Sequence, residues 1–542
     1  MEPDILRILS VFGRPLTNQV EYSQRLIEAG DEYLRLAGMA ALLEFSMWPP
    51  ALWEKAVQAS KHGLVASKAF KFFVDNYEYE LAERVAAIVD VAEKPLTADR
   101  MRAAIRLDAP RLIDMYARQF LHDGRTEHLI SAADQAEKAH GWRASIVWLA
   151  RATALQPIRV DEAYRLLRVL ETANQFEAIE EILGIFARGG VFGEMQAIFG
   201  GLLKLRSKDF KGAMQAVAKL RLAEMRGGAA RLCQINAEAH EGLGQYRDAY
   251  KWYRQLNRQG MQPGVDKRDF MAAIERLSRI SYPTLADDAR TDTVMMTGFP
   301  RSGTTLLEHA LSAHPSVETF EEIPSVTSMA LAIDRAVEAG IKGESERREA
   351  FERARARYYV ELDRRRTKPG ASVLIDKLPL RSAWIQILEH FFPKQRYVFS
   401  IRHPYDVVLS CFKQHFTPNM AMENFRTLED ACDLYDRVMS LWFGVFPDES
   451  ERVLYVRYDE LVTSFEEQVK RTLAFLGLPW SDAVLQFADL SESRRVATPS
   501  YAKVRAGLSL GVQTSWQNYR FALDNAHGAK LHRWIDRFGY ER

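Results

Sequence analysis

Gly298-Phe-Pro-Arg-Ser-Gly303-Thr-Thr305 stands between two apolar segments, Val294–Thr297 before it and Leu306–Leu311 after it. This order predicts a strand, a turn bounded by glycines, and a helix. Glycine allows the unusual backbone angles of a loop that wraps around a phosphate. The first amides of the following helix then point at the anion, together with the positive end of the helix dipole. The segment therefore predicts a phosphate-binding turn at the start of an α/β domain.

The turn differs from a Walker A motif at one position, since Thr304 stands where that motif requires lysine. The lysine normally reaches the β- and γ-phosphates of a triphosphate, so its absence argues against an ATPase or a kinase. Arg301, inside the turn, can supply positive charge instead. A simple glycine turn before a helix is the alternative interpretation.

Short apolar runs alternate with helical stretches beyond this turn. Further strands are predicted at Val373–Ile375, Tyr397–Ile401 and Val453–Val456, and a helix at Asp459–Leu476. Alternating strands and helices favour a parallel sheet with helices on both faces. Ligands of such sheets bind at the carboxyl ends of the strands.

A second anion site is predicted after the strand Tyr397–Ile401. Arg402 follows that strand directly and can hold an anion bidentately. Ser410 lies eight residues further, about two helical turns on, where it can share the same anion. In the alternative, Arg402 merely pairs with Asp406, because exposed pairs of this kind are common and weak. His403 is expected to set the helix start beside Pro404.

The first half of the chain is helical in pattern and carries a period. Aromatic residues recur with spacings of 34, 34 and 36 residues, and a small residue follows each within a turn: Trp142 and Ala144, Phe176 and Ala178, Phe210 and Ala213, Tyr246 and Ala249. This resembles the helical hairpin of tetratricopeptide (TPR) repeats; a non-repeating helical domain is the alternative. We expect a helical region at 1–120, TPR-like repeats at 121–280 and an α/β domain at 290–542, with a polar linker at Ala286–Asp292.

Composition excludes several classes of protein. The 542 residues carry a formal net charge of +1, whereas nucleic-acid-binding proteins are usually strongly basic. The three cysteines form no CxxC pair and no zinc-ligand cluster, so no metal is predicted. The N-terminus lacks an apolar signal segment, and no apolar run has the length of a membrane span. We expect a cytoplasmic protein without nucleic-acid or membrane partners.

The phosphate turn resembles the 5′-phosphosulfate-binding loop of sulfotransferases, over roughly residues 293–520. The chain as a whole resembles TPR-containing sulfotransferases of the bacterial type. Within the family, the tyrosylprotein branch is most similar, on Pro300–Leu306, Ala313–Pro315, the pair Glu321-Glu322 and Leu476–Leu485. The resemblance implies an α/β P-loop-like fold, the donor 3′-phosphoadenosine 5′-phosphosulfate (PAPS), the product PAP, and no metal.

The resemblance also implies roles for single residues. Glu322 would be the general base, which is chemically reasonable because a phenol with a pKa near ~10 must lose its proton during attack. Lys377 and Ser500 would stabilise the bridging oxygen of the leaving phosphate. The nucleotide would be bound by Arg301, Ser302, Gly303, Thr304, Thr305, Arg402, Ser410, Tyr458, Lys503 and Arg505. If the resemblance misleads, Glu321 could be the base, or Glu322 a solvated acid.

The pattern departs from the tyrosylprotein branch at two places. Ile323 and Pro324 replace an expected basic residue, and Ala506–Ser509 replaces a proline-bearing stretch. Both departures concern the acceptor side. The leading hypothesis is a PAPS-dependent O-sulfotransferase acting on tyrosine of a peptide or protein docked on the TPR-like region. The alternatives are a carbohydrate or small-alcohol sulfotransferase and an inactive TPR scaffold. A homodimer is left open.

Overall fold

The computed structural model describes residues 160–172, 174–225, 228–259, 267–278, 285–286, 290–321, 344–416, 418–486 and 515–542. The chain divides into two compact units, residues 1–179 and residues 180–542. Helix α11 (Val160–Thr172) belongs to the first unit, and α12 (Phe176–Gly189) spans the boundary. The expected helical region at 1–120 lies outside the described residues, and the proposed domain boundaries stay predictions.

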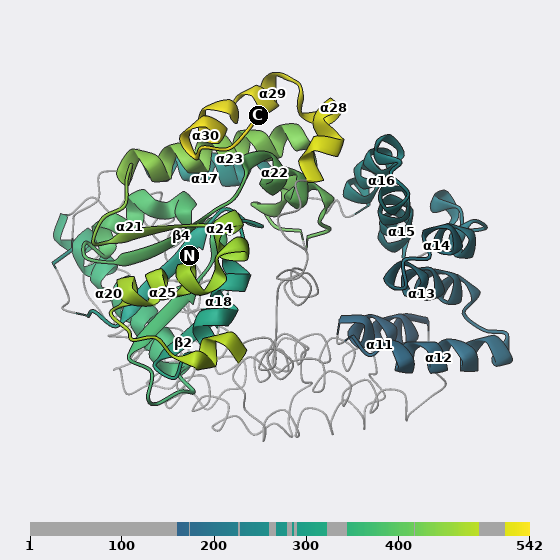
Figure 1. The fold of residues 1–542 in the computed structure, drawn as a ribbon, viewed down its shortest axis with the longest axis horizontal. Coiled ribbons are helices and arrows are strands. Elements are labelled where there is room, and N and C mark those ends of the chain that lie inside the picture. Colours follow the sequence, from purple (N-terminus) through teal and green to yellow (C-terminus); the bar gives the residue numbers. More distant parts are fainter. Residues whose placement is uncertain are drawn as a thin grey trace, which may run out of the picture. The chain divides into compact units, whose positions relative to one another are not determined.

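A five-stranded parallel sheet forms the centre of the C-terminal region (Figure 1). Its strands are β1 (Thr293–Gly298), β2 (Val317–Glu321), β3 (Val373–Lys377), β4 (Arg396–Ile401) and β5 (Val453–Arg457), in the order β2-β3-β1-β4-β5. The predicted parallel sheet is confirmed. The sequence does not predict β2, a five-residue edge strand in which only Val317 and Phe320 are apolar.

The two faces of the sheet pack against different helices. Val294 and Met296 of β1 face α18 (Thr304–Ser312), α24 (Tyr458–Thr463) and α25 (Phe465–Leu476). Their neighbour Met295 belongs to a second apolar cluster, because successive side chains of a strand point to opposite faces. Helices α20, α21, α22 and α23 contribute to this second cluster, with bounds Glu344–Arg364, Ile385–Phe391, Pro404–Lys413 and Leu428–Val445. Helices therefore cover both faces, as the alternating pattern predicts.

The helix predicted over Asp459–Leu476 is wrong in one respect, since two helices occupy this range. The backbone leaves the helical region at Ser464, with φ −131° and ψ 51°, between α24 and α25. Serine competes for backbone hydrogen bonds and so favours helix ends over helix interiors. An apolar period alone does not reveal such an interruption.

Helices α13 to α17 precede the sheet, with bounds Gly193–Arg206, Phe210–Val217, Ala229–Gly242, Tyr246–Arg258 and Lys267–Ser278. Helix α13 packs against α14, and α15 packs against α16. Phe210 and Tyr246, two of the periodic aromatic residues, are each the first residue of a helix. A Cβ atom on Gly242, the last residue of α15, would lie 2.4 Å from the Phe210 ring, so α14 and α15 approach closely there. The assignment to TPR repeats stays a prediction, and Trp142 lies outside the described residues.

The helical hairpin formed by α15 and α16 packs directly on α22. The Asn257 side chain donates a hydrogen bond to the Phe412 carbonyl at 2.8 Å, and both residues are buried. Lys413, the last residue of α22, forms an ion pair with Glu241. Arg426 donates to the carbonyl of Asn257. The helical hairpin and the α/β region thus belong to one packed unit.

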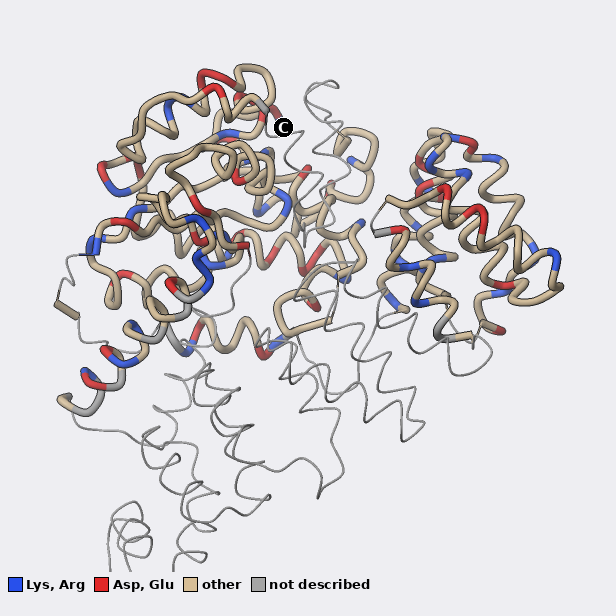
Figure 2. Tube along the Cα trace, turned by 90° about the horizontal axis from the view of Figure 1, so that it is seen from below, with Lys and Arg blue, Asp and Glu red and all other residues tan. Residues whose placement is uncertain are grey.

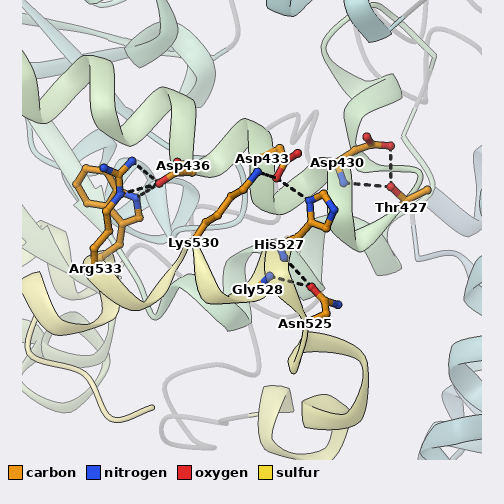
Figure 3. Close-up of polar contacts among 10 residues, drawn as sticks. Thr427, Asp430, Asp433, Asp436, Asn525, His527, Gly528, Lys530 and Arg533 are labelled. Carbon is orange, nitrogen blue, oxygen red and sulfur yellow. Dashed lines mark hydrogen bonds and ion pairs between the residues drawn. The ribbon is translucent and has the colours of Figure 1, made fainter.

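The C-terminal segment covers α23 with short helices (Figure 1). Asp433 of α23 accepts hydrogen bonds from His527 and Lys530, and Asp436 accepts from Arg533 (Figure 3). The short helices are η6 (Ser515–Tyr519), α28 (Arg520–Leu523), α29 (Ala526–Ala529) and α30 (His532–Arg537). Further 3-10 turns are η2 (Leu222–Glu224), η3 (Pro379–Trp384), η4 (Met422–Phe425) and η5 (Asp482–Gln486).

Charge is distributed evenly over the described chain. Lys and Arg are interspersed with Asp and Glu along most of the trace in Figure 2. Among the described helices, none is both long and apolar enough to cross a membrane. No group of three or more His, Cys, Asp or Glu side chains in the described ranges could hold a metal ion.

Candidate functional site

The phosphate turn connects the carboxyl end of β1 with the first turn of α18. Arg301 has φ 73° and Gly303 has φ 98°, and a positive φ at a non-glycine residue such as Arg301 is uncommon and strained. A Cβ atom on Gly303 would lie 2.4 Å from the Tyr458 ring. Thr304 and Thr305 are buried at the start of α18. The turn therefore brings its backbone close to Tyr458, which only glycine permits.

The two predicted anion sites meet at neighbouring strands. The Arg301 Nε atom donates to the Ser410 hydroxyl at 3.1 Å, and Arg402 donates to the Arg301 carbonyl at 3.4 Å. The Arg402 guanidinium lies over the Tyr458 ring, 4.5 Å from its centroid. Because β1 and β4 pair directly while their following connections lead to opposite sides, this is the switch point where sheets of this class bind ligands. Gly303, beside the Tyr458 ring, belongs to the same cluster as Arg301, Arg402 and Ser410.

The electrostatics of this cluster suit an anion. Burial lowers the pKa of Arg301, and the nearby charge of Arg402 lowers it further. Asp406 Oδ1 accepts hydrogen bonds from the Ser515 hydroxyl and the Trp516 amide. Burial raises the pKa of Asp406, and the nearby charge of Arg402 opposes this rise. A bound anion would satisfy two crowded guanidinium groups and the helix N-terminus together.

His403 determines the start of α22, as expected. Its Nδ1 atom accepts from the Tyr405 amide at 3.2 Å, so the ring proton lies on Nε2, which donates to the Glu541 carbonyl at 2.9 Å. Burial lowers the pKa of His403, which keeps the ring neutral. This residue holds the C-terminal segment beside Arg402.

Lys377 occupies the carboxyl end of β3 between two acids. Its Nζ atom lies 2.9 Å from Glu321 Oε1 and 3.3 Å from Glu308 Oε2. Glu321 is the register partner of Lys377 in the neighbouring strand, and Glu308 comes from α18. Burial raises the pKa of Glu308 to about 7; Lys377 opposes this shift and Glu321 adds to it.

Glu308 was not predicted as a site residue. The signal in the sequence was a glutamate in the middle of the buried helix that begins at Thr304. A charged residue at such a position is rarely buried without a partner. The partner, Lys377, is distant in the sequence, and only the sheet brings the two together.

The turn after Lys377 is locked to the end of β1. The Ser382 hydroxyl donates to the Gly298 carbonyl at 2.6 Å, and the Ser382 amide donates to the Thr297 hydroxyl at 3.0 Å. Arg381 and Asp376 form a fully buried ion pair at 2.7 Å. Lys377 and the phosphate turn are therefore held in one rigid arrangement.

Four predicted site residues lie outside the described residues: Glu322, Ser500, Lys503 and Arg505. Their roles stay predictions. The described residues Arg301, Ser302, Gly303, Thr304, Arg402, Ser410 and Tyr458 lie around the phosphate turn, where Ser302 donates to the Phe299 carbonyl at 2.7 Å. Thr305 follows in the first turn of α18.

A sequence model described as the sulfotransferase family matches residues 293–482. The C-terminal region of this chain carries a sulfotransferase-family domain. The match begins at the first residue of β1 and ends just beyond α25, so it contains all five strands of the sulfotransferase domain. The resemblance seen in the phosphate turn is thereby confirmed for this region, while the TPR part stays a prediction.

Curated relatives include protein-tyrosine sulfotransferases. Protein-tyrosine sulfotransferase 1 of Danio rerio is 27% identical over 207 residues, which is 36% of this chain and 56% of the relative. The Drosophila melanogaster protein-tyrosine sulfotransferase is 28% identical over 204 residues, 35% of this chain and 39% of the relative. An uncharacterised Aquifex aeolicus protein is 27% identical over 261 residues, 45% of this chain and 32% of the relative. The chain thus spans about half, or less, of the relatives' own length.

Solved structures include the sulfotransferase domain of the Synechococcus PCC 7002 olefin synthase. It is 20% identical, with a TM-score of 0.36, and the match covers 48% of this chain and all of that domain. Mouse sulfotransferase SULT7A1 complexed with PAP is 16% identical, with a TM-score of 0.26, covering 49% of this chain and 87% of that one.

Proposed function

We propose that this protein is a PAPS-dependent O-sulfotransferase. The observation that carries the proposal is the convergence of Arg301, Arg402 and Ser410 at the switch point beside the N-terminus of α18. The ribose of PAPS carries one phosphate on its 5′ position, joined to the sulfate, and one on its 3′ position. A phosphate turn on β1 and a cationic site on β4 supply one anchor for each.

We propose the following reaction. The acceptor hydroxyl attacks sulfur, its proton passes to Glu322, a new O–S bond forms, and the bond from sulfur to the 5′-phosphate oxygen breaks. Lys377 donates a hydrogen bond to that oxygen as negative charge develops on it. The leaving nucleotide is PAP, held by Arg301 and Arg402. Neither electrons nor a metal need to be supplied from outside.

The proposed acceptor is tyrosine in a peptide or protein. Similarity to protein-tyrosine sulfotransferases and the pair Glu321-Glu322 support this choice. The helical hairpins α13–α16 offer a surface on which such a peptide could dock. A carbohydrate or small alcohol is the second candidate, favoured by Ile323 and Pro324 at the place of an expected basic residue.

The test measures donor binding and acceptor choice separately. Titration of the protein with PAP, followed by calorimetry, is expected to show one site. Incubation with ³⁵S-labelled PAPS, tyrosine peptides and glycans is expected to label peptide tyrosine. Arg402→Ala should abolish both signals, whereas Glu322→Gln should abolish only transfer. Label on a glycan would favour the carbohydrate sulfotransferase. PAP binding without any transfer would favour the inactive scaffold. Absence of PAP binding would refute the proposal.

A further inference from the structure

The surroundings of Lys377 contain two acids that the proposed reaction does not use. The Lys377 side chain is 0% exposed and pairs with two carboxylates of unequal exposure, Glu321 at 14% and Glu308 at 5%. Glu321 ends a strand at the edge where the site lies. Glu308 lies deeper, within α18. The two acids thus hold the same ammonium from different elements.

Glu308 is costly for the fold as a purely structural residue. Its Oε2 atom is buried and has no hydrogen-bond partner among the described residues, although it lies within ion-pair distance of Lys377. A buried carboxylate that is incompletely hydrogen-bonded destabilises a protein. Such groups in native structures often serve a function.

Helix α18 gives Glu308 a fixed relation to the donor. Thr304 is the first residue of this helix, and Glu308 follows four residues later, one turn along the same face. The helix that presents its N-terminus to the phosphate thereby also reaches Lys377. The distance between the phosphate turn and the Lys377 ammonium is set by one rigid element.

We propose that Glu308 is a positioning residue that holds the Lys377 ammonium in place during sulfuryl transfer. This inference rests on the proposed function. An ammonium has three N–H donors, so two carboxylates from α18 and β2 determine where the third one points. They also compensate the positive charge of this buried ammonium, which would be costly without a partner. Glu308 acts through Lys377 and does not touch the donor.

The charged groups that act on Glu308 come from two strands. Lys377 of β3 lowers the pKa of Glu308 and Glu321 of β2 raises it, while the Thr319 hydroxyl of β2 hydrogen-bonds to the ionised form. Protonation of Glu308 removes one of the two negative charges beside Lys377. Turnover is therefore expected to fall as the pH drops through the pKa of Glu308.

The experiment compares Glu308→Gln with Glu318→Gln. Glu318 is also buried in β2 and hydrogen-bonded, to Thr367 and Lys368, but does not contact Lys377. Release of PAP from PAPS is measured with para-nitrophenol as acceptor, and PAP binding by calorimetry. Glu308→Gln should lower kcat roughly 10- to 100-fold, the equivalent of one charge-assisted hydrogen bond, and flatten its pH dependence near neutrality. PAP affinity should stay unchanged, and Glu318→Gln should turn over normally.

Two further variants separate positioning from folding. Glu308→Asp restores the charge one methylene short and should give an intermediate kcat. In a Lys377→Met background, adding Glu308→Gln should change kcat no further, because the partner is gone. Normal turnover in Glu308→Gln, or in Glu308→Asp if the first variant does not fold, would overturn the inference. An additional loss in the Lys377→Met background would do the same. Failure of the wild-type protein to bind PAP would instead refute the proposed function, and this inference with it.

Discussion

Gly303 shows how much of the donor site depends on a single residue. Its backbone has φ 98°, and the Tyr458 ring lies where a side chain would begin. Arg301, two residues earlier, accepts a strained φ of 73° and directs its guanidinium to Ser410. Strain that persists at such positions is typical of ligand-binding turns.

Gly303→Ala is expected to weaken PAP binding by more than about tenfold. The new methyl group would displace Tyr458 and, with it, the stacked Arg402, and alanine also disfavours positive φ. Calorimetric titration with PAP measures the effect. Gly200→Ala is the matched control, since nothing lies within 4 Å of its Cβ position in α13 and alanine favours helices. Equal PAP affinity in both variants would contradict the prediction.

The raised pKa of Glu308 predicts an effect on stability as well as on turnover. Its pKa is raised from 4.5 to about 7 in the folded protein, so the folded state binds more protons than the unfolded state between these values. The stabilisation is present below 4.5 and is lost as the pH rises through about 7. Glu308→Gln should remove this dependence, on the order of 1–3 kcal/mol in the free energy of unfolding. Urea unfolding at about pH 5 and about pH 8 tests it, and parallel pH profiles for wild type and variant would speak against it.

At the scale of elements, α22 connects the donor site to the helical hairpin. Arg402 precedes this helix, Ser410 lies within it, and Phe412 and Lys413 at its end contact α15 and α16. Packing at the C-terminal end of α22 therefore helps to hold Ser410 nearby and Arg402 at the start of the helix in place.

Asn257→Ala should destabilise the protein and weaken PAP binding together. It leaves the buried Phe412 carbonyl without its side-chain donor, at a cost of about 1–3 kcal/mol, and loosens the end of α22. Asn236→Ala is the control, because its buried side chain donates to the Leu232 carbonyl within the same helix, α15. Urea unfolding and PAP titration measure the two effects. A loss of stability with normal PAP affinity in Asn257→Ala would show that the hairpin does not support the donor site.

On the scale of the whole molecule, one apolar core extends from the hairpin into the α/β region. Cys233, Tyr253 and Phe270 belong to the same cluster as Trp384 and Trp442, and Phe270 contacts Trp384 edge to face. Domains that share a core fold together, since separating them exposes apolar surface. The helices α13–α17 and the α/β region therefore lie in one compact unit, residues 180–542.

A fragment of residues 180–542 should fold and bind PAP, whereas a fragment of residues 285–542 should not. The second cut removes α15, α16 and α17 and exposes Phe412 and Trp384. Thermal unfolding and PAP titration of both fragments provide the measurement. A cooperative transition and normal PAP affinity in the shorter fragment would show that the hairpin is an independent module.

Four of the five strands could be predicted from local pattern, as could the phosphate turn with its missing lysine. The strand β2 and the break at Ser464 could not, because a short edge strand and a single non-helical residue leave little periodic signal. The segments Ala313–Pro315 and Leu476–Leu485 carry separate parts of the resemblance. In the structure they touch, through a hydrogen bond between the His314 ring and the Pro479 carbonyl at 3.0 Å.

Sequence by itself determined that this protein has a phosphate turn without a Walker lysine and a parallel α/β fold behind it. These properties depend on residues that are neighbours along the chain. Tertiary structure alone decided that Arg301 meets Ser410, 109 residues away, and that Lys377 is held by Glu308 and Glu321. Such meetings follow from the strand order β2-β3-β1-β4-β5, which brings distant strand ends to one edge. Hydrophobic patterning specifies strands but not their order, so the geometry of the site emerged only with the sheet.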